Sequence, residues 1–247
     1  MKYMDKGISI AIPTYDSNGE GAEFIRFSLD QIKKQSFKDL EVIISDDSNN
    51  DNVEKLVNEY SDTLDIKYYK SENIALSDRP YNKGMTPNIN RAISKCTKSI
   101  IQILFQDDFF RTKNTLRSIY DFYENNNHEW AASWFYETKD GKTASRTAIP
   151  QYTERIYLGE NTMSSPSIVS FRNKESFDNH IFFDESLVML MDCDWYKRMA
   201  DKYGYPGTVQ HYGIVIRQHA GQISNNQGAE PGLIQREIQY CKSKFEG

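Results

Sequence analysis

The segment Glu41-Val42-Ile43-Ile44-Ser45-Asp46-Asp47 is a short apolar run that ends in two carboxylates. Its β-branched residues predict a buried strand, and its polar end predicts a turn. The run Ile8-Ser9-Ile10-Ala11-Ile12, which Pro13 ends, shows the same pattern earlier in the chain. Residues 99–105 show it later and lead into Gln106-Asp107-Asp108. Three such strands indicate one sheet with polar side chains along one edge.

Amphipathic segments separate these strands. Apolar residues recur at helical spacing between the first two strands, and Asp51 with Glu54 has the form of a capping box at the start of the next helix. The alternation continues with a strand at 66–69, a helix within 85–93 and a helix within 116–123. Alternating strands and helices predict an α/β fold, with a mainly parallel sheet flanked by helices.

The second half of the chain is less regular. Strands of mixed direction are expected around residues 130–136 and 168–171, and a helix from Asp192 to Tyr203. A terminal helix is expected to carry the narrow apolar stripe Ile234, Ile238, Cys241 and Phe245. We expect this helix to dock on the body of the protein, although a homo-oligomer contact would show the same stripe.

Composition excludes several classes of partner. The 247 residues carry 30 Lys and Arg against 35 Asp and Glu, a net charge of -5, which argues against nucleic acid or an anionic membrane as the principal partner. No apolar run approaches the roughly 18 to 20 residues of a membrane span, and the first run is too short for a signal peptide. Three cysteines fit no zinc spacing and cannot all pair within one chain. We therefore expect a cytoplasmic protein without disulfides.

Asp107-Asp108 is the most informative pair of carboxylates. Apolar sequence precedes it and Phe109-Phe110 follows it, so the two charges are costly to bury unless they share a cation. Hard oxygen ligands beside diphosphate oxygens favour Mg²⁺ or Mn²⁺. Turn capping would account for any one of the strand-end aspartates alone.

The ordered motifs resemble glycosyltransferase family 2, with its GT-A fold. Its strand-end and Asp motifs match residues 8–15, 42–51 and 103–108, and Arg217-Gln218-His219 is similar to its Arg-x-His segment. Residues 183–195 are similar to its Glu-Asp helix. The resemblance covers residues 8 to about 224. The chain departs from the family pattern at three positions, namely Met191 for Glu, Phe105 at the outer position of Asp-x-Asp, and Ile89 for an Arg found in many members.

This resemblance implies an inverting, metal-dependent transfer of a sugar from a nucleoside diphosphate sugar, with a UDP-sugar favoured, to a hydroxyl of a carbohydrate or other acceptor. Residues 1–125 would bind the nucleotide sugar and residues 126–247 the acceptor, within one domain. Asp192 would be the general base, and Asp108 and His219 would hold Mn²⁺ or Mg²⁺. The other donor-side residues that it implies are Pro13, Thr14, Tyr15, Asp46 at the nucleobase, Asp107, and Arg79 or Lys83 at the diphosphate.

Two other functions fit the same sequence less well. A nucleotidyltransferase would normally carry a Gly-rich phosphate loop after the first strand, where this chain has Pro13-Thr14-Tyr15-Asp16. A catalytically inactive sugar- or nucleotide-binding module would suit the departures at Phe105 and Met191.

Single residues also have plainer interpretations. Asp192 would serve as a helix cap, Asp46 as a turn cap and His219 as a surface loop residue. Three aromatic residues would either stack on an acceptor sugar or belong to the core: Trp134, Tyr136 and Trp195.

Overall fold

The computed structural model describes residues 5–16, 19–71, 85–174, 181–219, 222 and 231–247. A single nine-stranded sheet runs through these residues in the order β3-β2-β1-β4-β8-β6-β9-β5, and β7 pairs with β6 off this path. The strands are β1 (Asp5–Thr14), β2 (Leu40–Asp46), β3 (Ile66–Lys70), β4 (Lys98–Ile103), β5 (Phe109–Phe110), β6 (Trp130–Thr138), β7 (Ala144–Ala148), β8 (Val169–Arg172) and β9 (Gly207–Arg217).

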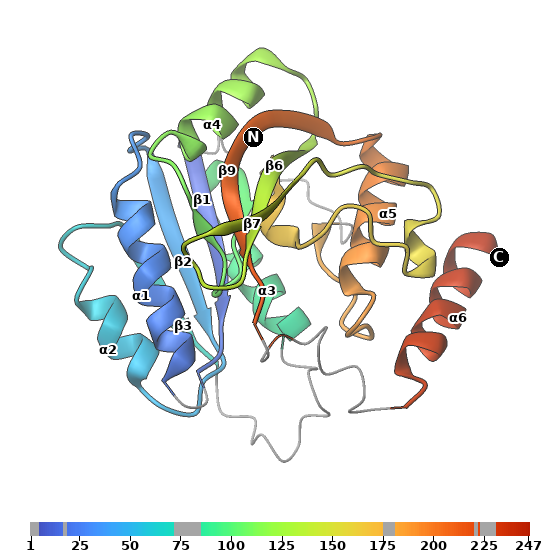
Figure 1. Cartoon of the computed structure of the whole chain (residues 1–247), viewed down its shortest axis with the longest axis horizontal. Helices are drawn as coiled ribbons and strands as arrows, with labels where there is room; N and C mark the ends of the chain where they lie inside the picture. Colours follow the sequence, from blue (N-terminus) through green and yellow to red (C-terminus); the bar gives the residue numbers. More distant parts are fainter. Residues whose placement is uncertain (1–4, 17–18, 72–84, 175–180, 220–221, 223–230) are drawn as a thin grey trace.

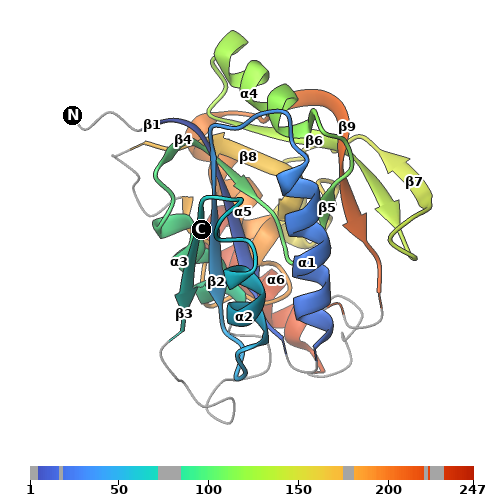
Figure 2. The same cartoon turned by 90° about the vertical axis from the view of Figure 1, so that its left-hand side faces the viewer.

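Helices lie on both sides of this sheet (Figure 1). They are α1 (Glu20–Lys33), α2 (Asn52–Asn58), α3 (Met85–Ser94), α4 (Thr115–Asn125), α5 (Met191–Tyr203) and α6 (Leu233–Glu246), with the short 3-10 turns η2 (Ile156–Leu158) and η3 (Pro166–Ile168). Figure 2 looks onto α1 and α2, which lie in front of the sheet, and Figure 1 shows α5 and α6 on the other side. The predicted α/β fold with flanking helices is confirmed.

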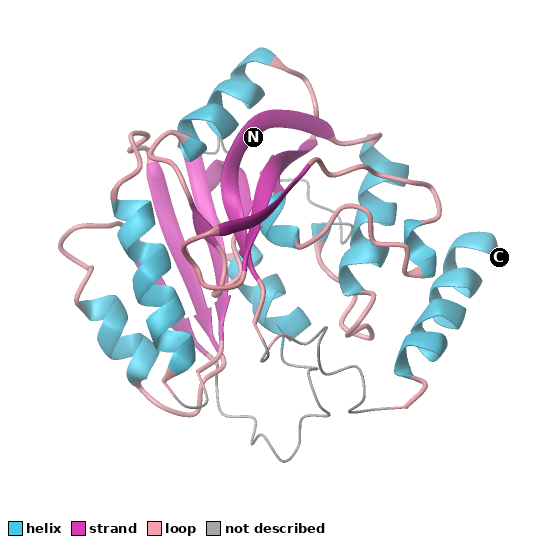
Figure 3. Ribbon diagram, in the orientation of Figure 1, coloured by secondary structure: helices cyan, strands magenta, loops and turns pink. Residues whose placement is uncertain are grey.

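Strand direction separates the two halves of the sheet. β1, β2, β3 and β4 are parallel to one another, with Thr14 opposite Asp46 where β1 and β2 end. The later strands are of mixed direction, as predicted, since β8 is antiparallel to β4 and β6 whereas β9 is parallel to β6 (Figure 3). Consequently β6 and β9 point the same way as β1 to β4, and the carboxyl ends of all these strands lie toward one edge.

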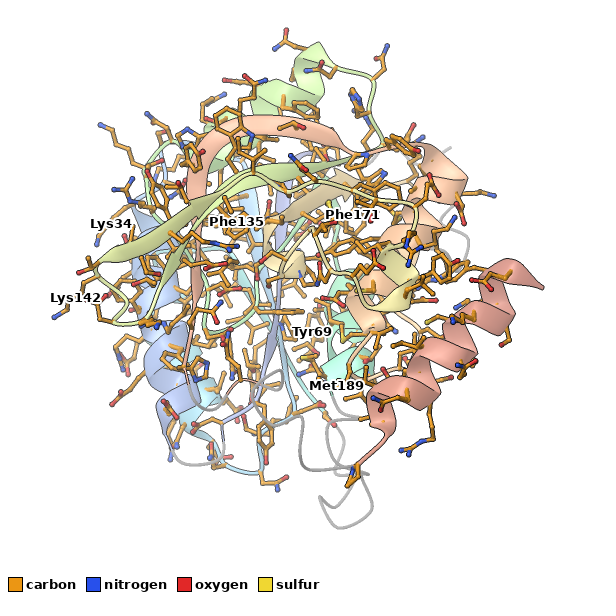
Figure 4. The ribbon with its side chains drawn as sticks, turned by 45° about the vertical axis from the view of Figure 1, so that its right-hand side comes forward. Lys34, Tyr69, Phe135, Lys142, Phe171 and Met189 are labelled. Carbon is orange, nitrogen blue, oxygen red and sulfur yellow. The ribbon has the colours of Figure 1, made fainter. Side chains whose placement is uncertain are left out.

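The core explains the apolar runs of the first half. All seven residues of β2 are buried, because β1 and β3 flank the strand and helices cover it. Interior strands of parallel sheets have both faces covered, so they lack polar alternation. Phe135 and Phe171, which Figure 4 labels, extend the core into the second half of the sheet and are 2% and 1% exposed.

Two local expectations are corrected. Asp51 is the N-cap of α2, but its side chain makes no capping bond, so the capping box does not form. β4 ends at Ile103, before the predicted 105, because the chain turns toward the Asp107-Asp108 bend. Trp195 follows the core interpretation rather than the acceptor-stacking one: it is fully buried, stacks on Phe183 and donates its indole N–H to the carbonyl of Ile181.

The terminal helix docks on its own chain. Cys241 on α6 is fully buried, and Ile234, Ile238 and Phe245 pack against the core. Glu237 on the same helix is buried and accepts hydrogen bonds from the backbone N–H groups of residues 188–190. Figure 4 shows Met189 of this segment beside α6. A homo-oligomer contact through α6 stays an untested prediction.

Candidate active site

Polar side chains collect where the parallel strands end. The end of β1 supplies Thr14 and Tyr15, the end of β2 supplies Asp46, the bend after β4 supplies Asp107 and Asp108, and the end of β9 supplies Arg217 and His219. The bend after β4 bridges to β1, since the Gln106 side chain accepts from the N–H of Tyr15 at 2.8 Å and donates to its carbonyl at 3.1 Å. One continuous sheet thus gathers residues from the two ends of the chain, from Thr14 to His219.

Asp46 is enclosed by its own chain. Its Oδ1 accepts hydrogen bonds from the Thr14 hydroxyl at 3.1 Å, from the backbone N–H of Ser48 at 2.8 Å and from the Ser48 hydroxyl. Its Oδ2 accepts from the Tyr68 hydroxyl at 2.6 Å and lies 3.3 Å from Lys70 Nζ. The carboxylate is fully buried, so a nucleobase would reach it by displacing Tyr68 or Lys70.

Pro13 and Tyr15 flank this network. Pro13 lies in β1 opposite Ser45, and its side chain is buried. Tyr15 is 38% exposed and so presents its ring to solvent at the end of β1. Arg79 and Lys83, which were predicted to face a diphosphate, lie outside the described residues.

Asp107 pairs with His219 across the end of the sheet. The His219 Nε2 lies 3.0 Å from Asp107 Oδ2, and this contact raises the pKa of His219 above its ordinary value. Arg217 donates from Nε to the Asp107 carbonyl at 3.0 Å, while its guanidinium packs on the rings of Phe24, Phe27 and Phe109. Both side chains of the Asp107–His219 pair remain about a fifth exposed, at 17% and 21%.

The turn between β6 and β7 closes over Arg217. Gly141 in this turn has φ +72°, and a Cβ there would lie 2.2 Å from Arg217 Nη1. The left-handed backbone favours glycine here, and a side chain would also have to displace the Arg217 guanidinium. The predicted Asp140-Gly141 turn therefore helps to hold the residue that fixes Asp107.

Asp108 points into the protein. Its side chain is 2% exposed, and it accepts hydrogen bonds from the backbone N–H of Arg217 at 3.0 Å and from the Ser165 hydroxyl at 3.2 Å. Burial, and next the charge of Asp107, raise the pKa of Asp108 well above its usual range. Asp107 and His219 thus face outward, and Asp108 supports them from within.

This arrangement fits a divalent metal with few protein ligands. Within the described ranges no three His, Cys, Asp or Glu side chains gather into a metal-binding group. The carboxylate and imidazole of Asp107 and His219 are adjacent, however, and are suitable donors for Mn²⁺ or Mg²⁺ completed by diphosphate oxygens. The residues present therefore fit such an ion, with Asp107 rather than Asp108 as the outward carboxylate.

Asp192 lies in the first turn of α5, where its carboxylate borders a small cavity. Its Oδ1 accepts from the backbone N–H of Cys193 and its Oδ2 from the Asn161 side chain, both at 2.7 Å. The N-cap of α5 is Leu190, so Asp192 is not the helix cap. Burial raises the pKa of Asp192 to about 6. A carboxylate whose pKa is near neutral can take a proton from a hydroxyl.

The cavity beside Asp192 has a volume of about 120 Å³. Apart from Asp192, its walls are apolar: Met85, Phe105, Pro166, Val188, Met189 and Met191. Two of the three sequence departures from the family pattern, Phe105 and Met191, thus form part of the wall of this cavity. Among the described residues of the lining, Asp192 is the single charged group.

Comparison with known proteins decides the family. The model of glycosyl transferase family 2 matches residues 9–201, which is most of the chain. The chain belongs to glycosyl transferase family 2. The predicted resemblance is confirmed, and this match is to a family of glycosyl transferases rather than of nucleotidyltransferases.

Individual relatives are more distant. A segment of 102 residues is 28% identical to the GalNAc(5)-diNAcBac-PP-undecaprenol beta-1,3-glucosyltransferase of Campylobacter jejuni, covering 41% of this chain and 29% of that protein. The chain thus spans less than a third of the length of this curated relative.

Solved structures share the fold. S. aureus TarS 1-349 in complex with UDP-GlcNAc superposes with a TM-score of 0.75 at 18% identity, over 96% of this chain and 66% of that one. Mannosyltransferase PcManGT from Pyrobaculum calidifontis, in complex with GDP-Man and Mn²⁺, superposes with a TM-score of 0.56 at 14% identity, over 92% of this chain and 63% of that one. These likenesses confirm the predicted GT-A fold class.

Sequence reasoning missed several residues of the site. Asn161 and Ser165 lie in an irregular loop with no periodic pattern, and Glu237 looks like a surface residue of an amphipathic helix. Arg91, whose Nη2 lies 2.5 Å from Asp47 Oδ1, stands two residues after Ile89, the position at which many family members carry an Arg. No local sequence pattern predicts these contacts, because each joins residues at least 31 positions apart.

The structure describes no helix long and apolar enough to cross a membrane. Its three cysteines are buried and unpaired.

Proposed function

We propose that the protein is an inverting glycosyltransferase that moves a sugar from a UDP-sugar to a hydroxyl of a carbohydrate or other acceptor, with a divalent metal. The observation that carries this proposal is that one short loop contacts both carboxylates with raised pKa values. Asn161 of this loop contacts Asp192, and Ser165 contacts Asp108. A base for the acceptor and a support for the diphosphate site are therefore held together.

The donor would lie across the carboxyl ends of the strands. Thr14, Tyr15 and Asp46 at the ends of β1 and β2 would border the nucleobase, with Pro13 behind them. Asp107 and His219 would face the diphosphate and hold the metal, while Asp108 fixes their bend. The UDP-GlcNAc complex of TarS, which has the same fold, supports a uridine donor for this chain.

The residues of this chain would act on a proton and on geometry. Asp192 would take the proton from the acceptor hydroxyl as that oxygen attacks the anomeric carbon, and the bond from that carbon to the diphosphate breaks. One displacement inverts the configuration at that carbon. The apolar cavity walls would exclude water from Asp192 and limit hydrolysis. A metal bound at Asp107 and His219 would supply Lewis acidity for the leaving diphosphate.

A donor screen tests this proposal. Purified protein is incubated with UDP-, GDP- and TDP-sugars, with Mn²⁺, Mg²⁺ or chelator, and the release of nucleoside diphosphate is measured. We expect turnover with a UDP-sugar and a metal. Failure with every nucleotide sugar, while UDP still binds, would favour the inactive binding module.

Asp108→Ala tests the role of the metal in donor binding. We expect this variant to lose the Mn²⁺-dependent part of UDP affinity in calorimetry, because the support of the Asp107–His219 pair is removed and the diphosphate then meets uncompensated charge. Equal and metal-independent affinity in both proteins would remove the metal from the mechanism.

A further inference from the structure

Asn161 uses every polar atom of its side chain. Its Oδ1 accepts from the backbone N–H groups of Met163 at 3.0 Å and Ser164 at 2.9 Å, which forms a tight turn. Its Nδ2 donates to the Ser164 carbonyl at 3.3 Å and to Asp192 Oδ2 at 2.7 Å. One amide thus builds the turn and holds the carboxylate of α5.

The turn is held in a conformation that its sequence does not favour. Ser164 has φ 77°, and it is the one non-glycine with positive φ among the described residues. This left-handed conformation costs about 1 kcal/mol for a residue with a Cβ. The Ser164 carbonyl also accepts from the Tyr196 hydroxyl of α5 at 2.9 Å, so two side chains fix it.

The next residue reaches the other carboxylate. Ser165 donates its hydroxyl to Asp108 Oδ2 at 3.2 Å and caps η3 by accepting from the N–H of Ser167 at 3.3 Å. The left-handed residue between Asn161 and Ser165 turns the chain so that one side chain meets α5 and the other meets the bend after β4. Loop geometry therefore connects the acceptor side to the donor side.

We infer that Asn161 is a positioning residue for sugar transfer, which aims the Asp192 carboxylate at the acceptor and, through its turn, sets Ser165 against Asp108. This inference rests on the proposed function, in which Asp192 is the base. Each carboxylate oxygen of Asp192 keeps a further lone pair after its bonds to Asn161 and Cys193, so the base is oriented without being used up.

The surroundings make the amide the dominant polar contact from outside α5. Among the described residues, Cys193 and Tyr196 are titratable groups that interact with Asp192, and both lie on α5 itself. The elements that face it across the cavity contribute apolar side chains, namely Met85 from α3, Phe105 from the bend after β4, and Pro166 from η3. Asn161 is itself exposed, but a charge placed at position 161 would lie within hydrogen-bond distance of Asp192 Oδ2, beside these apolar walls.

Asn161→Asp tests the role with little change of shape. The new carboxylate still accepts from the N–H groups of Met163 and Ser164, so the turn is kept, but the donor to Asp192 becomes a like charge. We expect the pKa of Asp192, followed by carboxyl carbon NMR and assigned with Asp192→Asn, to rise from about 6 by one unit or more. For a rise of one unit, we expect kcat at pH 6.5 to fall about threefold and to recover at higher pH. UDP affinity should stay within about twofold, since the donor contacts are untouched.

The control is Asn58→Asp, which adds the same charge on the exposed face of α2. Asn161→Ser removes the donor without adding a charge and is measured beside Asn161→Asp. We expect it to raise the pKa of Asp192 by a smaller amount. If Asn161→Asp does not fold, Asn161→Ser is the test. A pKa and a pH profile equal to those of Asn58→Asp, or a rate loss equal at every pH, would overturn the inference. If Asp192→Asn transfers sugar at the parental rate, the proposed base has failed instead, whatever the Asn161 variants do.

Discussion

Two regions of the molecule bury carboxylates in opposite ways. In the β1–β2 region, Asp16 and Glu41 are each surrounded by hydrogen-bond donors. Burial by itself would raise the pKa values of both carboxylates, but hydrogen bonds from neighbouring groups lower them. In the region of α5 and the bend after β4, burial prevails, and the pKa values of Asp108 and Asp192 are raised. In the first region the carboxylates stabilise the fold through hydrogen bonds. In the second region the hydrogen bonds do not offset the effect of burial on the carboxylates. The two carboxylates with raised pKa values are the two that the loop of Asn161 and Ser165 contacts.

Glu41→Gln should show the largest effect on stability. Glu41 is fully buried and accepts from Ser9, Thr97 and Lys67, so the amide leaves several partners unpaired. We expect urea unfolding at pH 7 to show a loss of about 3 kcal/mol. Because the folded pKa of Glu41 is lowered, its contribution is complete above about pH 4.3, the unfolded value, and is lost as pH falls through the folded pKa.

The difference between Glu41→Gln and the parent should therefore shrink below pH 4. Glu59→Gln, which removes an exposed partner of Arg26, is the matched control and should change stability little. A loss of stability for Glu41→Gln no larger than that of the control would contradict the stabilising role of the buried carboxylates in the β1–β2 region.

Glu237→Ala should have the next largest effect. It leaves three backbone N–H groups before α5 without their acceptor, for an expected loss of about 2 kcal/mol. Glu246→Ala, on the exposed side of the same helix, is the control. Thermal and urea unfolding of both variants measure the difference, and equal stability would mean that water replaces the carboxylate without cost.

The sequence predicts these two regions unequally. Strands β1, β2 and β4 could be predicted because interior strands of a parallel sheet are largely continuous apolar runs. The edge strand β3 is only partly buried, and its Ile66 and two tyrosines still mark it as a strand. β9 could not, since polar Thr208, Gln210 and His211 interrupt it, and its pairing with β6 shifts register between Ser133 and Phe135. Two-residue β5 is too short to leave a pattern.

Site residues divide in the same manner. Strand ends place Thr14, Asp46 and Asp107 by topology alone, and the resemblance supplied Asp192 and His219. The partners that tune them, such as Asn161 and Ser165, come from loops, whose path depends on tertiary contacts rather than on local periodicity. The enclosure of Asp46 by five donors was likewise invisible in the sequence.

Nucleobase selectivity should show the smallest effect. We expect UDP and TDP to bind more tightly than ADP or CDP, with Asp46→Asn reducing the ratio by about tenfold, because an amide cannot accept equally at both positions. Competition titration of the five diphosphates measures it; a GDP preference would change the base but not the chemistry. If Asp46→Asn weakens the binding of all five diphosphates equally, Asp46 is a turn cap with a purely structural role.

The rate of sugar transfer by Asp192→Asn tests the central claim most directly, which is that the poorly compensated carboxylate of α5 is the base. The amide keeps the shape and the backbone hydrogen bond but cannot take a proton. At saturating donor and acceptor, we predict a fall of at least about 100-fold, with UDP affinity within about twofold of the parent. Transfer at the parental rate would contradict the claim.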